Sequence, residues 1–211
     1  MARMELMVNI IIPSLMNSKL NLLAFASLLL ARATTLAEVD LGIPAGNTPY
    51  DRYMSPVKQV LCSLRHQSTD IRRAEDLLRV GHNFRYSFTD PYTAALPSVT
   101  AQTHSGDCKA KSLWLVDQLG DANVRFVIGK ARASSKISHA WVMWNDGQAW
   151  WILDPTNASR PIPAASAPRN EYIPLYSWAR NGSYRHTATA TGVTAVASKT
   201  HRAPASAAGR N

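Results

Sequence analysis

Cysteine and long apolar runs are both scarce in this sequence. Only Cys62 and Cys108 occur among its 211 residues, so a disulfide framework does not hold the fold together. The apolar stretch 20–30 is interrupted by Asn21 and Ser27, and it is shorter than the roughly 20 residues that a membrane-spanning helix needs. No run of Lys and Arg alternates with aromatic residues, so we expect no nucleic-acid partner.

The sequence does contain enough apolar material for a core, together with an excess of positive charge. Hydrophobic residues make up 46% of the chain, and its length fits one domain of ordinary size. The formal net charge is +9, which favours contact with acidic surfaces such as anionic lipid or acidic cell-wall polymer. A basic, solvated surface without a specific partner explains the same charge.

Residues 1–37 have the pattern of a secretory signal peptide. Lys19 precedes the apolar stretch, and small residues follow it in Ala31–Ala33 and Thr35–Ala37. A basic start, a short apolar middle and an A-x-A-like end are typical of exported proteins, and Met16 offers a second possible start. We therefore expect a periplasmic or secreted protein with no stable membrane span after signal removal. A retained N-terminal anchor is the alternative.

Behind this segment the sequence predicts an irregular lead-in, one folded domain and a disordered tail. Pro and Gly are frequent in 38–56, whereas 57–186 carries the apolar periodicity of a domain. After His186 the chain has almost no large apolar residue. Residues 187–211 therefore cannot bury enough surface to become ordered.

Apolar periodicity predicts three helices within the domain, at 56–66, 70–80 and 109–119. Asp70 can cap the second helix, and Gly81 and Gly120 can end the second and third. The third helix is apolar around most of its circumference, which is typical of a central position. We expect Cys62, in the first helix, to be a small core residue.

Alternating apolar residues and turn signals predict several short strands. They cover 84–88, 124–128, 139–144, 150–154 and 172–185, with loops at 90–105, 130–138 and 155–169. The predicted fold class is α+β, with a central helix packed on an antiparallel sheet.

Cys108 stands where a nucleophile is favoured. It follows Gly106 and Asp107 and directly precedes the third helix. Its thiol therefore lies at the positive end of the helix dipole, which favours the thiolate. A lone cysteine is more often a small buried residue, so the position needs partners.

A hairpin signal supplies those partners. With a tight two-residue turn at Asp146-Gly147, strand pairing continues outward until His139 lies opposite Asp154. Their Cβ atoms would then be about 4.5–5.5 Å apart. A carboxylate at that distance holds one imidazole nitrogen and leaves the other free for a thiol. A surface cross-strand ion pair is the alternative.

With these three residues in place, the chain resembles the transglutaminase-like superfamily, and within it the bacterial transglutaminase-like cysteine proteinases. The resemblance extends over about half of the chain, in Asn83–Tyr86, Gly106–Cys108, His139–Val142, Trp151–Asn157, Tyr172–Ser177 and Tyr184–His186. It implies a papain-like fold in which Cys108 is the nucleophile, His139 the base and Asp154 the residue that orients the base.

The implied reaction is acyl transfer through a thioacyl intermediate. The oxyanion is expected to be held by the backbone N–H of Cys108 and by one upstream side chain. Gln102 and Tyr92 are the candidates for that second donor.

We expect neither a metal nor another cofactor. Calcium-binding members of the family carry acidic residues directly after the cysteine, where this chain has Lys109 and Ala110. His104 and Cys108 are suitable zinc ligands, but no CxxC or HExxH pattern accompanies them.

Three functions are compatible with this pattern. The first is an exported cysteine peptidase that acts on a protein or peptide. The second is a transglutaminase or amidase that acts on protein or cell-wall amides. The third is a non-catalytic binding module on the same fold, which the complete Cys-His-Asp set argues against because binding alone needs no such set. Fold by itself does not choose among them.

Overall fold

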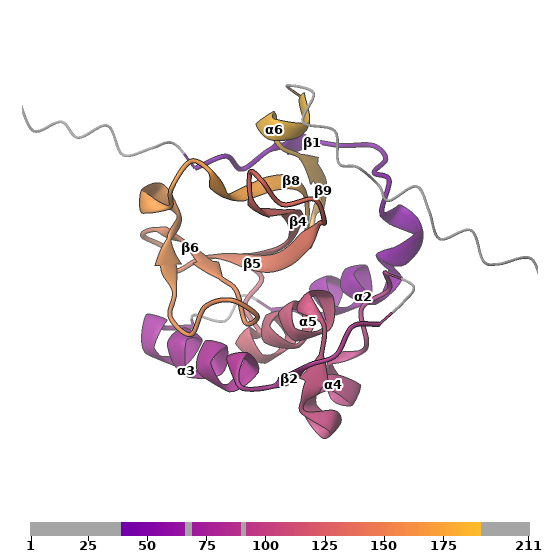
Figure 1. The fold of residues 1–211 in the computed structure, drawn as a ribbon, viewed down its shortest axis with the longest axis vertical. Coiled ribbons are helices and arrows are strands. Elements are labelled where there is room, and N and C mark those ends of the chain that lie inside the picture. The colour runs from indigo at the N-terminus through magenta and orange to yellow at the C-terminus, as the bar shows by residue number, and fades with distance from the viewer. Residues whose placement is uncertain (1–38, 66–68, 90–91, 191–211) are drawn as a thin grey trace, which may run out of the picture. The chain divides into compact units, whose positions relative to one another are not determined.

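The computed structural model describes residues 39–65, 69–89 and 92–190. The predicted signal peptide, 1–37, lies outside the described residues, as does 191–211 of the predicted tail. The fold class is α+β, as the sequence predicts. Helices α2 to α5 gather on one side of an antiparallel sheet (Figure 1).

The main sheet has the strand order β1-β9-β8-β4-β5-β6-β7, and every neighbouring pair is antiparallel. Its strands are β1 Ile43–Pro44, β4 Val124–Arg132, β5 His139–Asn145, β6 Trp150–Leu153, β7 Ile162–Pro163, β8 Glu171–Ala179 and β9 Gly182–Arg185. A separate parallel pair joins β2 Arg85–Tyr86 to β3 Ser105–Gly106.

Among the described residues, four α-helices and a 3-10 turn precede the long strands of the sheet. They are η1 Asp51–Tyr53, α2 Ser55–Ser63, α3 Ile71–His82, α4 Pro97–Thr103 and α5 Cys108–Leu119. A second 3-10 turn, η2 Ala164–Ser166, and a short helix, α6 Thr187–Ala190, follow later. Within the described part of the chain, none of the helices has the length and apolar character that crossing a membrane requires.

Helix α5 is the centre of the helical layer. Leu113, Leu115 and Val116 are completely buried, and together with side chains of α2 and α3 they pack on the sheet beside Phe126 and Trp144. This burial around the whole helix matches the apolar circumference in its sequence. Gly120 ends the helix in the left-handed conformation, as predicted, with φ of 66°.

The far face of the sheet carries a smaller core. Val127, Trp141, Met143 and Ile152 form it. Because side chains alternate across a strand, Phe126 and Val127 of β4 serve the two faces in turn. Both faces of the sheet therefore carry a core.

Several helix predictions need correction. Residues 90–105 were expected to be a loop, yet they contain α4, whose first residue is Pro97. Proline is favoured in the first turn, where its missing N–H costs nothing. Gly81 lies inside α3 instead of ending it. Cys62 is exposed on α2, because the buried stripe of that helix consists of its Val and Leu residues.

The strand predictions also need adjustment. Strand β2 is shorter than the predicted 84–88, β4 continues to Arg132, and 172–185 forms two strands. The lead-in 38–56 contains β1 and η1, and the tail predicted from 187 begins with helix α6. Segment ends depend on backbone pairing with distant residues, which local patterns do not report.

Candidate active site

Asp107 builds the position of Cys108. Its carboxylate caps α5 by accepting hydrogen bonds from the backbone N–H groups of Lys109, at 3.0 Å, and Ala110, at 3.1 Å. The other oxygen accepts from the Thr89 hydroxyl at 2.8 Å and pairs with the Lys109 ammonium at 2.5 Å. Cys108 is therefore the first residue of a firmly capped helix, and its side chain is half-buried.

The electrostatics of Asp107 follow from these bonds. Burial favours the neutral acid, but the Lys109 ammonium and the N–H donors outweigh it and lower the pKa of Asp107. The carboxylate is therefore ionised at neutral pH, and it keeps the start of α5 fixed beneath the thiol.

His139 begins β5 and contacts Asp154, which directly follows β6. The Nε2 atom of His139 lies 2.8 Å from Oδ2 of Asp154. Asp154 is completely buried, whereas the His139 side chain keeps 11% of its surface exposed. The two residues predicted to be partners are thus brought together.

The hairpin that joins them differs from the prediction. Asn145 pairs with Trp150 and Val142 with Leu153, so four residues, not two, connect the strands. The Asp146 side chain stabilises this longer loop by accepting from the N–H groups of Gln148, at 2.8 Å, and Ala149, at 2.7 Å.

The register is therefore displaced by two positions, and His139 does not lie directly opposite Asp154. A displacement of two keeps both side chains on the same face of the sheet, because strand side chains alternate with period two. Asp154 lies beyond the last paired residue of β6, where the chain is free to turn toward the imidazole.

The chain after Asp154 curls back to hold the carboxylate. The backbone N–H groups of Thr156 and Asn157 donate to Oδ1 at 2.9 and 3.2 Å. The Asn157 side-chain amide donates to Oδ2 at 2.9 Å. Its nitrogen also lies 3.0 Å from Nε2 of His139, but two N–H donors do not bond to each other, so Asp154 accepts from both. Burial raises the pKa of Asp154, yet these donors, His139 first, lower it overall.

The thiol of Cys108 also acts on the imidazole of His139. Burial lowers the pKa of His139, but hydrogen bonds to Asp154 and Cys108, and the charges of both groups, outweigh it and raise the pKa to about 10. Because Nε2 faces Asp154, Nδ1 is the ring nitrogen that is left for the thiol. The thiol of Cys108 therefore belongs to the surroundings of the imidazole, together with Asp154.

Comparison with known proteins gives a distant match. No protein-family model matches the chain, and no curated protein matches it. Among solved structures, LapG of Legionella pneumophila has a TM-score of 0.46 and 14% identity, over 68% of this chain and 82% of LapG. Its calcium-bound form has a TM-score of 0.45 and 15% identity, over 64% and 77%.

Tyr172 is a neighbour of the site that the sequence pattern missed. Its hydroxyl donates to Oδ2 of Asp154 at 3.2 Å, and both burial and the Asp154 charge raise its pKa. Its ring packs edge-on against Trp141, and Trp141 stacks on His139 with 6.1 Å between ring centroids. Tyr172 has a φ of 46°, a left-handed conformation that is costly for a residue with a side chain and is concentrated at functional sites.

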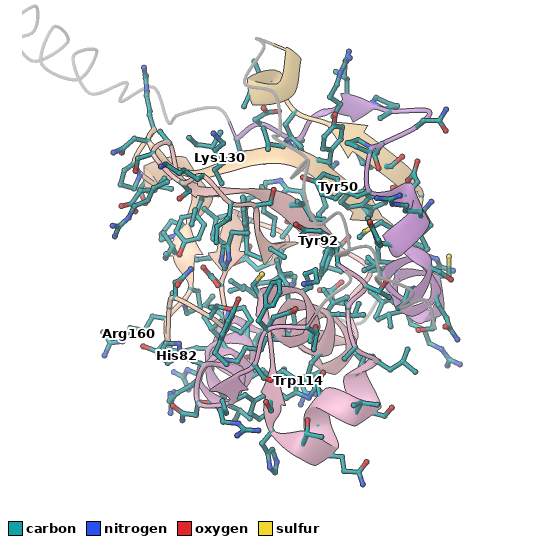
Figure 2. All side chains as sticks on the ribbon, turned by 45° about the vertical axis from the view of Figure 1, so that its right-hand side comes forward. Tyr50, His82, Tyr92, Trp114, Lys130 and Arg160 are labelled. Atoms are coloured by element: carbon teal, nitrogen blue, oxygen red, sulfur yellow. The ribbon has the colours of Figure 1, made fainter. Side chains whose placement is uncertain are left out.

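The two proposed oxyanion donors, Gln102 and Tyr92, stay predictions. Gln102 is exposed on α4. Tyr92, labelled in Figure 2, is half-buried, with the Lys109 ammonium 5.7 Å from its ring centre. Tyr86 is a further tyrosine on which the charges of the site act. Burial first, and then the charges of Cys108 and Asp107, raise the pKa of its phenol.

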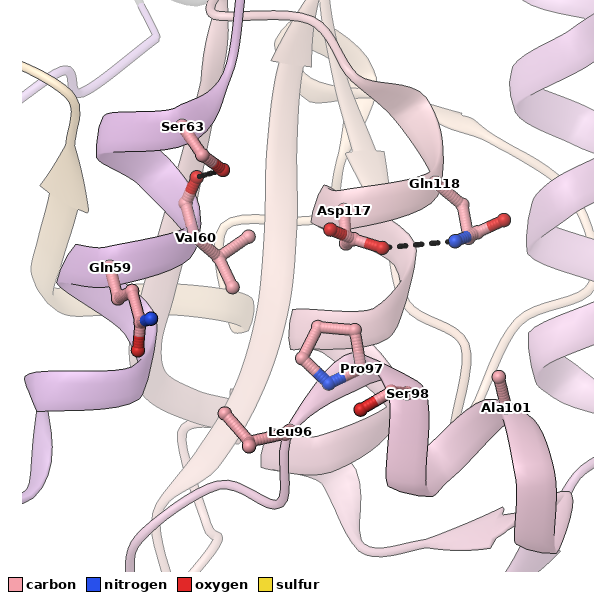
Figure 3. Close-up of a pocket in the computed structure, with 9 residues that line it drawn as sticks. All are labelled: Gln59, Val60, Ser63, Leu96, Pro97, Ser98, Ala101, Asp117 and Gln118. Atoms are coloured by element: carbon pink, nitrogen blue, oxygen red, sulfur yellow. Dashed lines mark hydrogen bonds between the residues drawn. The ribbon is translucent and has the colours of Figure 1, made fainter.

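One pocket on the surface lies apart from Cys108, His139 and Asp154. A pocket between α2, α4 and the end of α5 is lined by other residues, among them Val60, Pro97 and Gln118 (Figure 3). No cluster of three or more His, Cys, Asp or Glu side chains within the described ranges is suited to hold a metal ion.

Proposed function

We propose that this protein is an exported cysteine peptidase of the transglutaminase-like type, which hydrolyses amide bonds of a protein or peptide. The observation that carries the proposal is the hydrogen bond of 2.8 Å between His139 Nε2 and the buried carboxylate of Asp154. This bond holds the ring by one nitrogen and leaves the other available for the half-buried thiol of Cys108, whose influence on the pKa of His139 supports the proposal. Export rests on residues 1–37, which lie outside the described part of the chain.

In the proposed mechanism, His139 holds the proton of the Cys108 thiol, and the thiolate attacks the carbonyl carbon of a substrate amide. A ring that keeps its proton at neutral pH is suited to pair with a thiolate. His139 then gives the proton to the leaving amine, the C–N bond breaks and a thioester remains. Water, deprotonated by the same ring, attacks the thioester and releases the acid and the thiol.

The start of α5 supplies one donor for the oxyanion. The first N–H groups of a helix have no partner within it. Asp107 takes those of Lys109 and Ala110, whereas no acceptor within the described residues takes the N–H of Cys108. That N–H is free for a carbonyl oxygen that gains negative charge, and one such donor is typically worth about 2.7–4 kcal/mol of barrier.

The first test is the reactivity of Cys108 toward iodoacetamide, followed by mass spectrometry on the full chain. Cys62 is an internal control, because it is exposed on α2. We expect Cys108 to react faster than Cys62 at about pH 6, which is below the usual pKa of a free thiol of about 8.5, and His139→Ala to abolish the difference. Equal rates for both cysteines in the wild type would overturn the proposal.

A second measurement separates the reaction types. The wild type and Cys108→Ser are incubated with casein and a primary-amine probe, and the products are identified by mass spectrometry. Cleavage that requires Cys108 supports the peptidase. Amine incorporation without cleavage would instead indicate a transglutaminase, in which the amine replaces water as the acceptor.

A further inference from the structure

Lys111 is a buried lysine whose ammonium has no acidic partner at salt-bridge distance among the described residues. It lies on α5, one helical turn after Cys108, and keeps 2% of its surface exposed. Its ammonium donates hydrogen bonds to two backbone carbonyls, those of His82 at 3.3 Å and Pro155 at 3.2 Å. Among the described residues, no carboxylate forms an ion pair with it. The mechanism proposed above gives this side chain no role.

Burial of the Lys111 ammonium is unfavourable in free energy. Removing an ammonium from water is unfavourable even in a relaxed protein. Burial accordingly lowers the pKa of Lys111, although the negative charge of Asp154 acts in the opposite direction. An apolar side chain of similar length would fill the space without this cost. The position therefore calls for an explanation beyond packing.

Lys109, two residues earlier, shows how a buried lysine on this helix is otherwise balanced. Its ammonium lies 2.5 Å from the carboxylate of Asp107, so the two charges compensate each other. In the described ranges, the hydrogen-bond acceptors of the Lys111 ammonium are two neutral carbonyls. Its nearest compensating charge in the described structure is the longer-range one of Asp154.

The two carbonyls belong to segments that meet only in the folded chain. His82, labelled in Figure 2, is the last residue of α3, and a cation is favourable at a helix C-terminus because the carbonyls there carry partial negative charge. Pro155 directly follows Asp154. The two segments pack closely, since a Cβ added at Gly81 would lie 3.2 Å from the Cβ of Pro155.

We infer that Lys111 is a positioning residue, which ties the turn containing Asp154 to the helix that carries Cys108. The inference rests on the proposed function. Lys111 touches neither the thiol nor the imidazole in this role; it acts through the Pro155 carbonyl, one peptide away from Asp154. The separation of nucleophile and orienting carboxylate is thereby fixed by one side chain.

The expected effect is large because catalytic geometry is sensitive to small displacements. A misplacement of about 1 Å can lower a rate on the order of a hundredfold. Without the ammonium, the carbonyls of His82 and Pro155 lose their donor, and the turn is free to move relative to α5. His139 then loses its fixed orientation although it contacts none of the altered atoms.

The test uses Lys111→Met in the full chain, with Lys58→Met as the matched control. Lys58 lies on α2. Within the described residues, its only ion pair is an exposed one with Asp51. The readout is the ratio of the Cys108 to the Cys62 alkylation rates at about pH 6, together with urea unfolding. We expect Lys111→Met to lower the ratio on the order of tenfold or more, toward the value of His139→Ala, and Lys58→Met to leave it unchanged.

The outcomes are distinguishable. If Lys111→Met is folded and less stable but keeps the wild-type ratio, Lys111 is merely structural and the inference is overturned, while the proposed function stands. If His139→Ala has the same ratio of alkylation rates as the wild type, the proposed function itself is overturned. Should Lys111→Met not fold, Lys111→Gln decides. Its amide is too short to reach both carbonyls, so a several-fold lower ratio supports the inference and a wild-type ratio overturns it.

Discussion

The Nε2 atom of His139 and the Oδ2 atom of Asp154 lie 2.8 Å apart, at the open end of the hairpin formed by β5 and β6. His139 is the first residue of β5, and Asp154 is the first residue after β6. A carboxylate at the end of a strand can be surrounded by donors from its own turn, which is what Thr156 and Asn157 supply. The imidazole is therefore held by an acceptor that is itself fixed.

The raised pKa of His139 predicts how stability changes with pH. A pKa raised from 6.5 to about 10 means that folding favours the protonated ring. This stabilisation is complete below about pH 6.5 and is lost as the pH rises through about 10, at up to about 1.4 kcal/mol per pH unit. We expect the advantage of wild type over His139→Gln in urea unfolding to shrink between pH 6 and pH 10. A constant advantage would contradict the raised pKa.

Removing the Tyr172 hydroxyl should weaken Asp154 without disturbing the fold. Tyr172→Phe deletes a donor to the carboxylate, so the pKa of Asp154 rises. As the pH is lowered, the variant should therefore lose activity at a higher pH than the wild type does. We expect kcat to fall roughly tenfold, in keeping with the loss of about 1.4 kcal/mol, and KM to change little. Tyr176→Phe, on the same strand, is the control, and an equal effect from both variants would refute a specific role for Tyr172.

The two capping aspartates offer a matched comparison of stability. Asp70 caps α3 from an exposed position, whereas Asp107 caps α5 while completely buried and paired with Lys109. Asp70→Ala should cost about 1 kcal/mol, the usual value of a cap. Asp107→Ala should cost about 3–5 kcal/mol, because it also leaves a buried ammonium unpaired. Similar midpoints for both variants in urea unfolding would argue against this difference.

Gly129 is predicted to tolerate no side chain. A Cβ there would lie 2.1 Å from the Ile173 carbonyl oxygen and 2.6 Å from the Trp141 ring, at the strand position that pairs with His139. We expect Gly129→Ala to lower the free energy of unfolding by several kcal/mol. Gly46→Ala, where an added Cβ meets nothing within 4 Å, should change it by less than about 1 kcal/mol. Thermal unfolding of the two variants provides the measurement.

Export predicts a defined N-terminus for the mature protein. If 1–37 is a signal peptide, the intact mass of protein recovered from a bacterial periplasm should correspond to a start at Thr34 or Glu38, after the small-residue sites. A mass that retains Lys19 and the apolar stretch after it would instead support an N-terminal anchor.

The sequence by itself determined which residues are candidates for the site more fully than it determined their geometry. A capped, apolar helix after Asp107 and two apolar strands around Asp146 are local patterns, and both are present in the structure. They were enough to single out Cys108, His139 and Asp154. The predicted hairpin loop was wrong by two residues, and His139 is not paired with Asp154 across the strands. An even displacement preserves the face of each side chain, so the two side chains are still in contact.

Only the tertiary structure decided what surrounds those three residues. Tyr172 reaches Asp154 because β8 pairs with β4 across the sheet, and Lys111 reaches Pro155 because α5 packs against the end of α3. Both contacts join segments far apart in sequence. Local periodicity reports which face of an element is apolar, whereas the partner of a buried hydroxyl or ammonium depends on how the elements pack, and that is set by the whole core.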